Sequence, residues 1–190
     1  ISPSAAWQNF IYFGVNFLAA VIIFGRYLGN HLTSLGKNWW ECLKALILGF
    51  VFYWVSNYAL SWALSQLIPG FANLNDGQMQ KLLKENFYLM AAGVVILVPV
   101  AEETFYRGLI FGGLYSRSKA SAYVVSSLLF SAIHVLGYIG NASAWVVVGC
   151  FAQYLPAGLC LAWSFQESGS LFVPITIHTI VNLLAILSMR

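Results

Sequence analysis

Long apolar runs, separated by short polar stretches, dominate the order of residues along this chain. The first run, Trp7–Gly25, contains no charged residue, and Arg26 follows it directly. A helix needs about 20 consecutive, mainly apolar residues to cross a bilayer. On this criterion the pattern predicts spanning helices over Trp7–Gly25, Ala45–Ile68, Phe87–Tyr115, Tyr123–Ile139, Ser143–Phe165 and Leu171–Met189.

Turn-forming residues mark the breaks between these helices. Pro69–Gly70 ends the second run, and the stretch Asn73–Gly77 predicts a polar loop, followed by a short surface-lying helix over Gln78–Asn86. From Ala120 to Gln166 there is no Asp, Glu, Lys or Arg. This run is too long for a single crossing at about 1.5 Å per residue. We expect two helices here, with the break at Gly137–Asn141.

The composition agrees with a membrane protein. Hydrophobic residues make up 60% of the 190 residues and charged residues only 8%, whereas a soluble domain carries about a quarter charged residues. The mean hydropathy is +0.77. An ordinary soluble domain is therefore excluded. The net charge of +3 is too small for a nucleic-acid-binding surface, so we expect no nucleic-acid partner.

These observations predict an all-α fold, a polytopic membrane helix bundle with about six transmembrane helices. We find no linker or internal repeat, so residues 1–190 are expected to form a single integral membrane domain. Residues 87–190 would hold the candidate site, and residues 1–86 would add two spans and the polar loop.

Ionisable residues inside the predicted spans indicate a functional site. A charged side chain is costly within a bilayer and usually faces the bundle interior or a water-filled cavity. Glu102, Glu103 and Arg107 lie in the third predicted span, His134 in the fourth and His178 in the sixth. In a helix, Glu103 and Arg107 lie on one face and pair, whereas Glu102 points about 100° away. Glu102 is therefore the carboxylate that is left free to act.

Each of these residues also has a purely structural interpretation. Two adjacent glutamates followed by an arginine usually form a solvated helix face. A single histidine in an apolar helix is usually a packing residue, and Asn182, four residues after His178, would join helices by hydrogen bonds. The presence of polar residues on three helices favours a site. Glutamate, histidine and asparagine suit a carboxylate that activates water and donors that bind an oxyanion, as in amide or ester hydrolysis.

Three short motifs resemble those of a known family. Glu102–Gly108 (EETFYRG) resembles the EExxxR motif, Phe130–His134 resembles FxxxH and His178–Asn182 resembles HxxxN. They occur in the order found in the CPBP family, which comprises CAAX prenyl endopeptidases of the Ras-converting type, bacteriocin-processing and immunity proteins, and the Abi proteins. The similarity covers about Phe87 to the C-terminus.

The resemblance implies an intramembrane endopeptidase, a hydrolase that uses a glutamate-activated water and no cofactor or metal. Glu102 matches the catalytic base, and His134 matches the residue that helps to hold the water. His178 and Asn182 match the pair that binds the oxyanion of the scissile carbonyl.

The same resemblance implies that Glu103 and Arg107 form a pair that orients the site. The implied partners are membrane lipid and a peptide or protein substrate, which in this family includes lipidated, bacteriocin-like and signalling peptides. The expected location is the cell membrane of a prokaryote.

Two other functions remain open on the sequence alone. Glu102, His134 and His178 would supply three ligands for Zn²⁺ with an open fourth position, as in a metallopeptidase. The histidines lack the H-E-x-x-H spacing of such enzymes, however. The second alternative is a non-catalytic membrane scaffold or immunity protein that binds a peptide in the same pocket without cutting it.

Overall fold

The computed structural model describes residues 4–190, and every regular element in that part of the chain is helical. The predicted all-α fold is confirmed. Four helices are long and apolar enough to cross a membrane, namely Ala5–Lys37 (α1), Trp39–Leu67 (α2), the composite helix Phe87–Tyr115, and Ala144–Ser168 (α8). Two shorter apolar helices, Lys119–Ile133 (α7) and Phe172–Ser188 (α9), bring the set to the expected number of about six.

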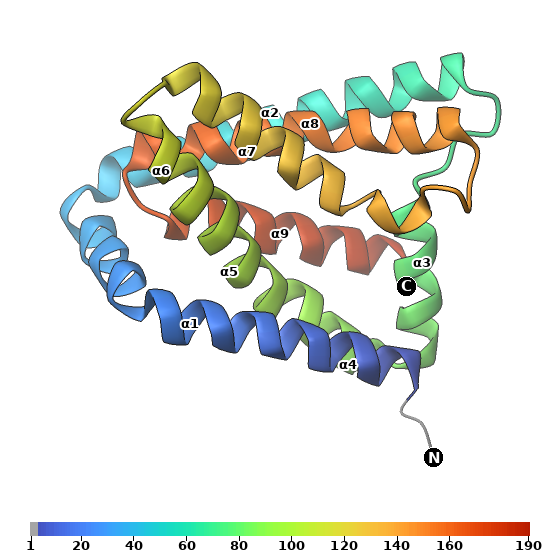
Figure 1. The fold of residues 1–190 in the computed structure, drawn as a ribbon, viewed down its shortest axis with the longest axis horizontal. Helices are drawn as coiled ribbons and strands as arrows, with labels where there is room; N and C mark the ends of the chain where they lie inside the picture. Colours follow the sequence, from blue (N-terminus) through green and yellow to red (C-terminus); the bar gives the residue numbers. More distant parts are fainter. Residues whose placement is uncertain (1–3) are drawn as a thin grey trace.

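The helices form a bundle in which α1 lies on one side and the paired helices α2 and α8 lie on the other (Figure 1). The composite helix and α9 lie between these two sides, and α7 crosses in front of α8, against which it packs (Figure 1). Helix α3 (Leu74–Glu85) closes the end of the bundle where α1 begins and α9 ends. Leu82 and Leu83 of α3 are buried there with Ala6, Met90 and Ile186.

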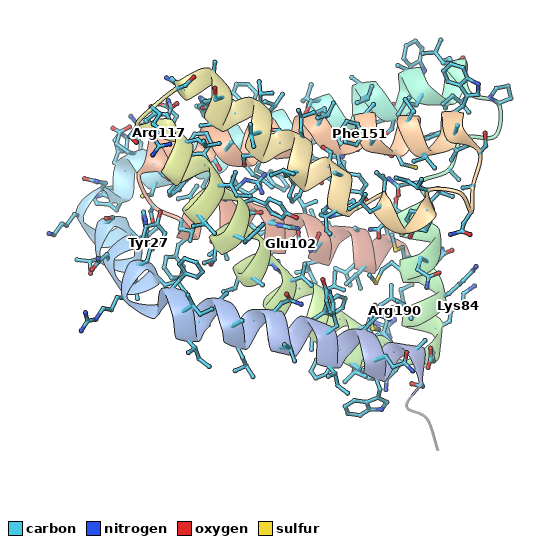
Figure 2. The ribbon with its side chains drawn as sticks, viewed as in Figure 1. Tyr27, Lys84, Glu102, Arg117, Phe151 and Arg190 are labelled. Carbon is cyan, nitrogen blue, oxygen red and sulfur yellow. The ribbon has the colours of Figure 1, made fainter. Side chains whose placement is uncertain are left out.

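The surface of the bundle is that of a membrane protein. Large apolar side chains stand exposed along the outer faces of the long helices, including Ile22 at 78%, Leu67 at 77% and Trp62 at 63% exposure. A soluble fold could not leave so much apolar surface in water. Among the charged side chains labelled in Figure 2, Arg117 lies at one end of the bundle and Lys84 and Arg190 lie at the other.

The composite helix changes its helical type along its length. Its α-helical parts are Phe87–Ala92 (α4), Val98–Glu103 (α5) and Gly112–Tyr115 (α6), and its π-helical parts are Gly93–Leu97 (η1) and Thr104–Phe111 (η2). π-helical turns are rare in proteins, and those that occur are often found at functional sites. The junction of α5 and η2 directly follows Glu102 and Glu103.

Helix α1 extends well beyond the predicted end of the first span. The sequence pattern ended that span at Gly25, but α1 kinks at Phe24 (φ −108°, ψ 15°) and continues to Lys37, and α2 begins at Trp39. The helix is longer than the predicted span because hydropathy detects where a helix leaves the hydrocarbon and not where the helix ends. Arg26 marks that exit, and a charged side chain does not by itself stop a helix.

Helix α7 also differs from its prediction. It runs from Lys119 to Ile133, so His134 is its C-cap residue and does not lie inside a span that continues to Ile139. The 3₁₀ turn Leu136–Tyr138 (η3) follows. The start is earlier because the Ser118 side chain accepts the backbone N–H of Ser121, which caps the first turn.

Helix α3 begins within the expected polar loop. The Asn73 side-chain oxygen accepts the backbone N–H groups of Asn75 and Asp76 at 2.9 and 3.3 Å and so caps the helix. The helix therefore covers Leu74–Glu85, whereas the prediction started at Gln78.

Candidate active site

A fully buried ion pair lies at the centre of the site. Nη1 of Arg107 donates to Oε1 of Glu103 at 3.1 Å, and both side chains have no exposed surface. Nη2 of Arg107 donates to the Gly158 carbonyl of α8, also at 3.1 Å. The expected pairing of these two residues is present, and the arginine also ties η2 to α8.

His178 joins this pair from α9. Its Nδ1 lies 2.9 Å from Oε1 of Glu103. A carboxylate only accepts hydrogen bonds, so this contact places the proton on Nδ1. The same oxygen of Glu103 therefore receives hydrogen bonds from both Arg107 and His178, which joins two helices through one buried carboxylate.

Glu102 points away from the pair into a groove. The groove lies between α1 and the helix α5–η2, has a volume of about 530 Å³ and is lined mainly by apolar residues, among them Phe13, Ala20, Phe24 and Phe105. We call it the apolar groove. The side chain of Glu102 is 25% exposed, and it lies at mid-length of the bundle (Figure 2).

His134 faces Glu102 across a short gap. Its Nε2 lies 4.0 Å from Oε2 of Glu102, which exceeds hydrogen-bonding distance. Its Nδ1 lies 2.8 Å from the Phe130 carbonyl oxygen, which only accepts, so Nδ1 carries the proton and Nε2 presents a lone pair. Its ring also stacks on Tyr154 of α8 at 4.2 Å between ring centres.

The Phe130 side chain connects the two halves of the site. Its ring centre lies 4.4 Å from the guanidinium carbon of Arg107, 4.7 Å from the His134 ring and 5.9 Å from the His178 ring. The three sequence motifs therefore meet around one buried aromatic ring.

Asn182 has a different neighbour. Its Nδ2 donates to the Val94 carbonyl in η1 at 2.9 Å, whereas His178 contacts Glu103. The structure thus gives the two candidate oxyanion residues separate protein partners. One hydrogen of the Asn182 amide is used by Val94, and the second remains available for a ligand.

Side-chain donors bind carbonyls of the π-helical segments. Besides Asn182 on Val94, Ser126 donates to the Tyr106 carbonyl at 3.0 Å, and Tyr27 donates to the Gly108 carbonyl at 3.5 Å. Irregular backbone within a membrane is tolerated where such partners satisfy it. The composite helix is thereby held by α1, α7 and α9.

Sequence reasoning missed two contributors, Tyr154 and the Gly158 carbonyl. The available signals were weak. Gln153 and Tyr154 form a polar pair within an otherwise apolar run, and Gly158 is a small residue of the kind that lets helices approach closely.

Gly158→Ala is expected to destabilise the protein by about 1 to 3 kcal/mol through overpacking. An added Cβ would lie 2.9 Å from the backbone Cα of Ser127, so α7 and α8 would have to separate. The measurement is thermal unfolding in detergent. Gly14→Ala is the matched control, since its Cβ meets no atom within 4 Å; equal melting temperatures for the two variants would contradict the expectation.

The candidate zinc ligands are not grouped as a metal centre. Within residues 4–190, no three His, Cys, Asp or Glu side chains are placed to hold one ion. Of the three residues considered, His178 turns its Nδ1 to Glu103 and not to Glu102.

Comparisons with known proteins place this geometry in a family context. A family model described as Type II CAAX prenyl endopeptidase Rce1-like matches residues 84–184, just over half of the chain. The UPF0177 protein YxdF of Lactococcus lactis subsp. lactis (strain IL1403) is 27% identical over 172 residues, which cover 87% of this chain and 88% of that protein. No solved structure matches the chain.

Proposed function

Because this chain belongs to the Rce1-like family of type II CAAX prenyl endopeptidases, which are membrane proteases with peptide or protein substrates, we propose that it is an intramembrane endopeptidase in which Glu102 activates water. The observation that carries this proposal is the 4.0 Å gap between Glu102 Oε2 and His134 Nε2. Both atoms are hydrogen-bond acceptors, and Oε2 of Glu102 is buried without a hydrogen-bond donor from residues 4–190.

A water between two acceptors would donate one hydrogen to each of them. That arrangement suits the gap, because polar atoms too far apart for a direct bond are commonly bridged by water. It also turns a lone pair of the water oxygen outward for attack. Because Arg107 pairs with Glu103, the carboxylate of Glu102 is left to take a proton from this water.

The proposed reaction is one addition followed by one elimination. The water oxygen bonds to the carbonyl carbon while Glu102 takes a water proton, and the carbonyl oxygen becomes an oxyanion. Glu102 then returns the proton to the amide nitrogen, the C–N bond breaks, and a carboxylic acid and an amine result. No covalent intermediate with the protein forms.

His178 and Asn182 are proposed to bind the oxyanion. With Nδ1 of His178 donating to Glu103, Nε2 donates only in the imidazolium form. In that form, the cluster of Glu103, Arg107 and His178 would carry a net positive charge as the oxyanion develops. The second hydrogen of the Asn182 amide is the other donor.

The apolar groove supports a substrate with a lipidated or hydrophobic segment. Glu102 lines this groove of about 530 Å³, so an apolar segment bound there would bring its neighbouring peptide bond close to the carboxylate. This is the reason to propose lipidated, bacteriocin-like or signalling peptides as substrates.

The test is incubation of the purified protein with hydrophobic and lipidated peptides, scored by mass spectrometry with and without a chelator. Cleavage at one bond that persists in the chelator and is lost in Glu102→Ala is the expected result. Saturable binding without cleavage would instead identify a scaffold. Loss of cleavage in the chelator, with recovery on adding Zn²⁺ alone, would identify a metallopeptidase.

Asn182→Ala is expected to lower kcat by about 10²- to 10³-fold with little change in peptide affinity, because the charge that it stabilises exists only in the transition state. Peptide binding and cleavage are measured in parallel. Asn9→Ala is the control, because it loses only the hydrogen bond from the Asn9 side-chain amide to the Ala5 carbonyl of the same helix. A variant that binds poorly but cuts normally at saturation would contradict the oxyanion role, as would a lowered melting temperature with normal kcat.

A further inference from the structure

A second cavity, of about 450 Å³, lies between α2, α8, α9 and the first turn of α3. Its size falls in the range of ligand sites. We call it the polar cavity, since its walls include Asn57, Ser61, Asn73, Asp76, Gln153 and Tyr154. None of these residues belongs to the three sequence motifs.

Hydrogen bonds fix the polar groups of this cavity. Nδ2 of Asn73 donates to Oε1 of Gln153 at 2.7 Å, and Nε2 of Gln153 donates to Oγ of Ser61 at 2.8 Å. The hydroxyl of Tyr154 lies 3.5 Å from Oδ1 of Asn73. A chain of amides and hydroxyls held from α2, α8 and the α3 N-terminus is preorganised to bind peptide N–H and C=O groups.

The polar cavity adjoins the candidate active site. Tyr154, one of its walls, stacks on His134 at 4.2 Å, and His134 faces Glu102. Val181, another wall, lies three residues after His178 and so about one turn away on α9. Since α1 and the pair α2–α8 lie on opposite sides of the bundle (Figure 1), the apolar groove and the polar cavity approach Glu102 and His134 from opposite sides.

The charge of the polar cavity is negative and unpaired. Asp76 is the one charged residue among its described walls, is exposed and forms no ion pair within residues 4–190. The aromatic residues Tyr53, Trp54 and Tyr58 line the same space. A carboxylate beside aromatic rings is the chemistry that attracts an ammonium or guanidinium group.

We propose that the polar cavity binds the substrate segment beside the scissile bond and that Asp76 selects a lysine or arginine side chain in that segment. This inference rests on the proposed function, which makes the ligand a peptide. A lipid amine offers the same charge. Two observations favour a peptide, namely the hydrogen-bonded chain of Asn73, Gln153 and Ser61 and the stacking of Tyr154 on His134.

The probe is a set of synthetic peptides that share one apolar segment and end in Ser-Lys-Asn, Ser-Gln-Asn or Ser-Glu-Asn. Binding to the full chain carrying Glu102→Gln is measured by fluorescence anisotropy in detergent, so that cleavage does not interfere. The lysine peptide is expected to bind about 10-fold more tightly than the glutamate peptide, a single charge contact being of this order. Asp76→Asn should remove the preference and Asp76→Lys should reverse it.

Glu41→Gln, an exposed carboxylate of α2 outside the cavity, is the matched control and should leave the preference unchanged. A preference that survives Asp76→Asn overturns the proposal. So does an Asp76→Asn variant that loses binding of phosphatidylethanolamine vesicles while peptide binding is unchanged. If the protein cuts these peptides but shows no preference for their charge, the role of the polar cavity is refuted and the proposed function stands. If it binds the lysine peptide most tightly but cuts none of the peptides, the proposed function alone is refuted.

Discussion

Replacement of Glu102 by glutamine is expected to lower the rate of peptide cleavage by about 10²- to 10⁴-fold, the usual contribution of a general base. Glutamine keeps the size of the side chain but cannot take a proton from water. The melting temperature should hardly change, because Glu102 is partly exposed to the apolar groove and lies 4.0 Å from His134, beyond hydrogen-bonding distance. Turnover at saturating peptide and thermal unfolding in detergent are the two measurements.

Glu103→Gln is the matched comparison, since it makes the same chemical change one residue away. Glu103 is fully buried and holds both Arg107 and His178, so its loss should lower stability as well as activity. The proposed division of roles predicts that only the Glu102 variant stays stable while inactive. A fully active Glu102→Gln, or two variants with the same melting temperature, would contradict it.

The helical fold and the ion pair could be predicted from the sequence because both depend on local spacing. Uncharged runs of about 20 residues cross a bilayer as helices, since a helix satisfies its own backbone hydrogen bonds. Glu103 and Arg107 are four residues apart, so their pairing follows from helical geometry. The 100° offset of Glu102 followed from the same geometry, and Glu102 does face the groove.

The contacts that His134 makes outside its own helix, and the partners of His178 and Asn182, could not be predicted in this way. Each depends on contacts between helices, and spacing within one helix does not report them. The π-helical turns that expose the Val94 and Tyr106 carbonyls have no marker in the hydropathy pattern either. Sequence reasoning could place polar residues on three helices, but only the packing of those helices around Phe130 decides which atoms meet.

Arg107→Ala is expected to destabilise the protein by about 3 to 5 kcal/mol, the cost of leaving one partner of a buried ion pair uncompensated. Arg107 has no exposed surface, and its loss would remove the bond to Glu103, the bond to the Gly158 carbonyl and the contact with the Phe130 ring. Activity should fall with stability, because Glu103 would no longer be fixed beside His178. Chemical unfolding in detergent measures the loss of stability.

Two further variants complete this test, a surface control and a variant that separates the charge of Arg107 from its shape. Arg117→Ala removes an exposed arginine near the end of the bundle and should leave the stability unchanged. Arg107→Lys keeps the positive charge near Glu103 but cannot reproduce the planar fork that reaches both Glu103 and Gly158. It should therefore recover only part of the lost stability. If Arg107→Ala were as stable as Arg117→Ala, the buried pair would not hold η2 against α8, and the fixed position of Glu103 beside His178 would need another cause.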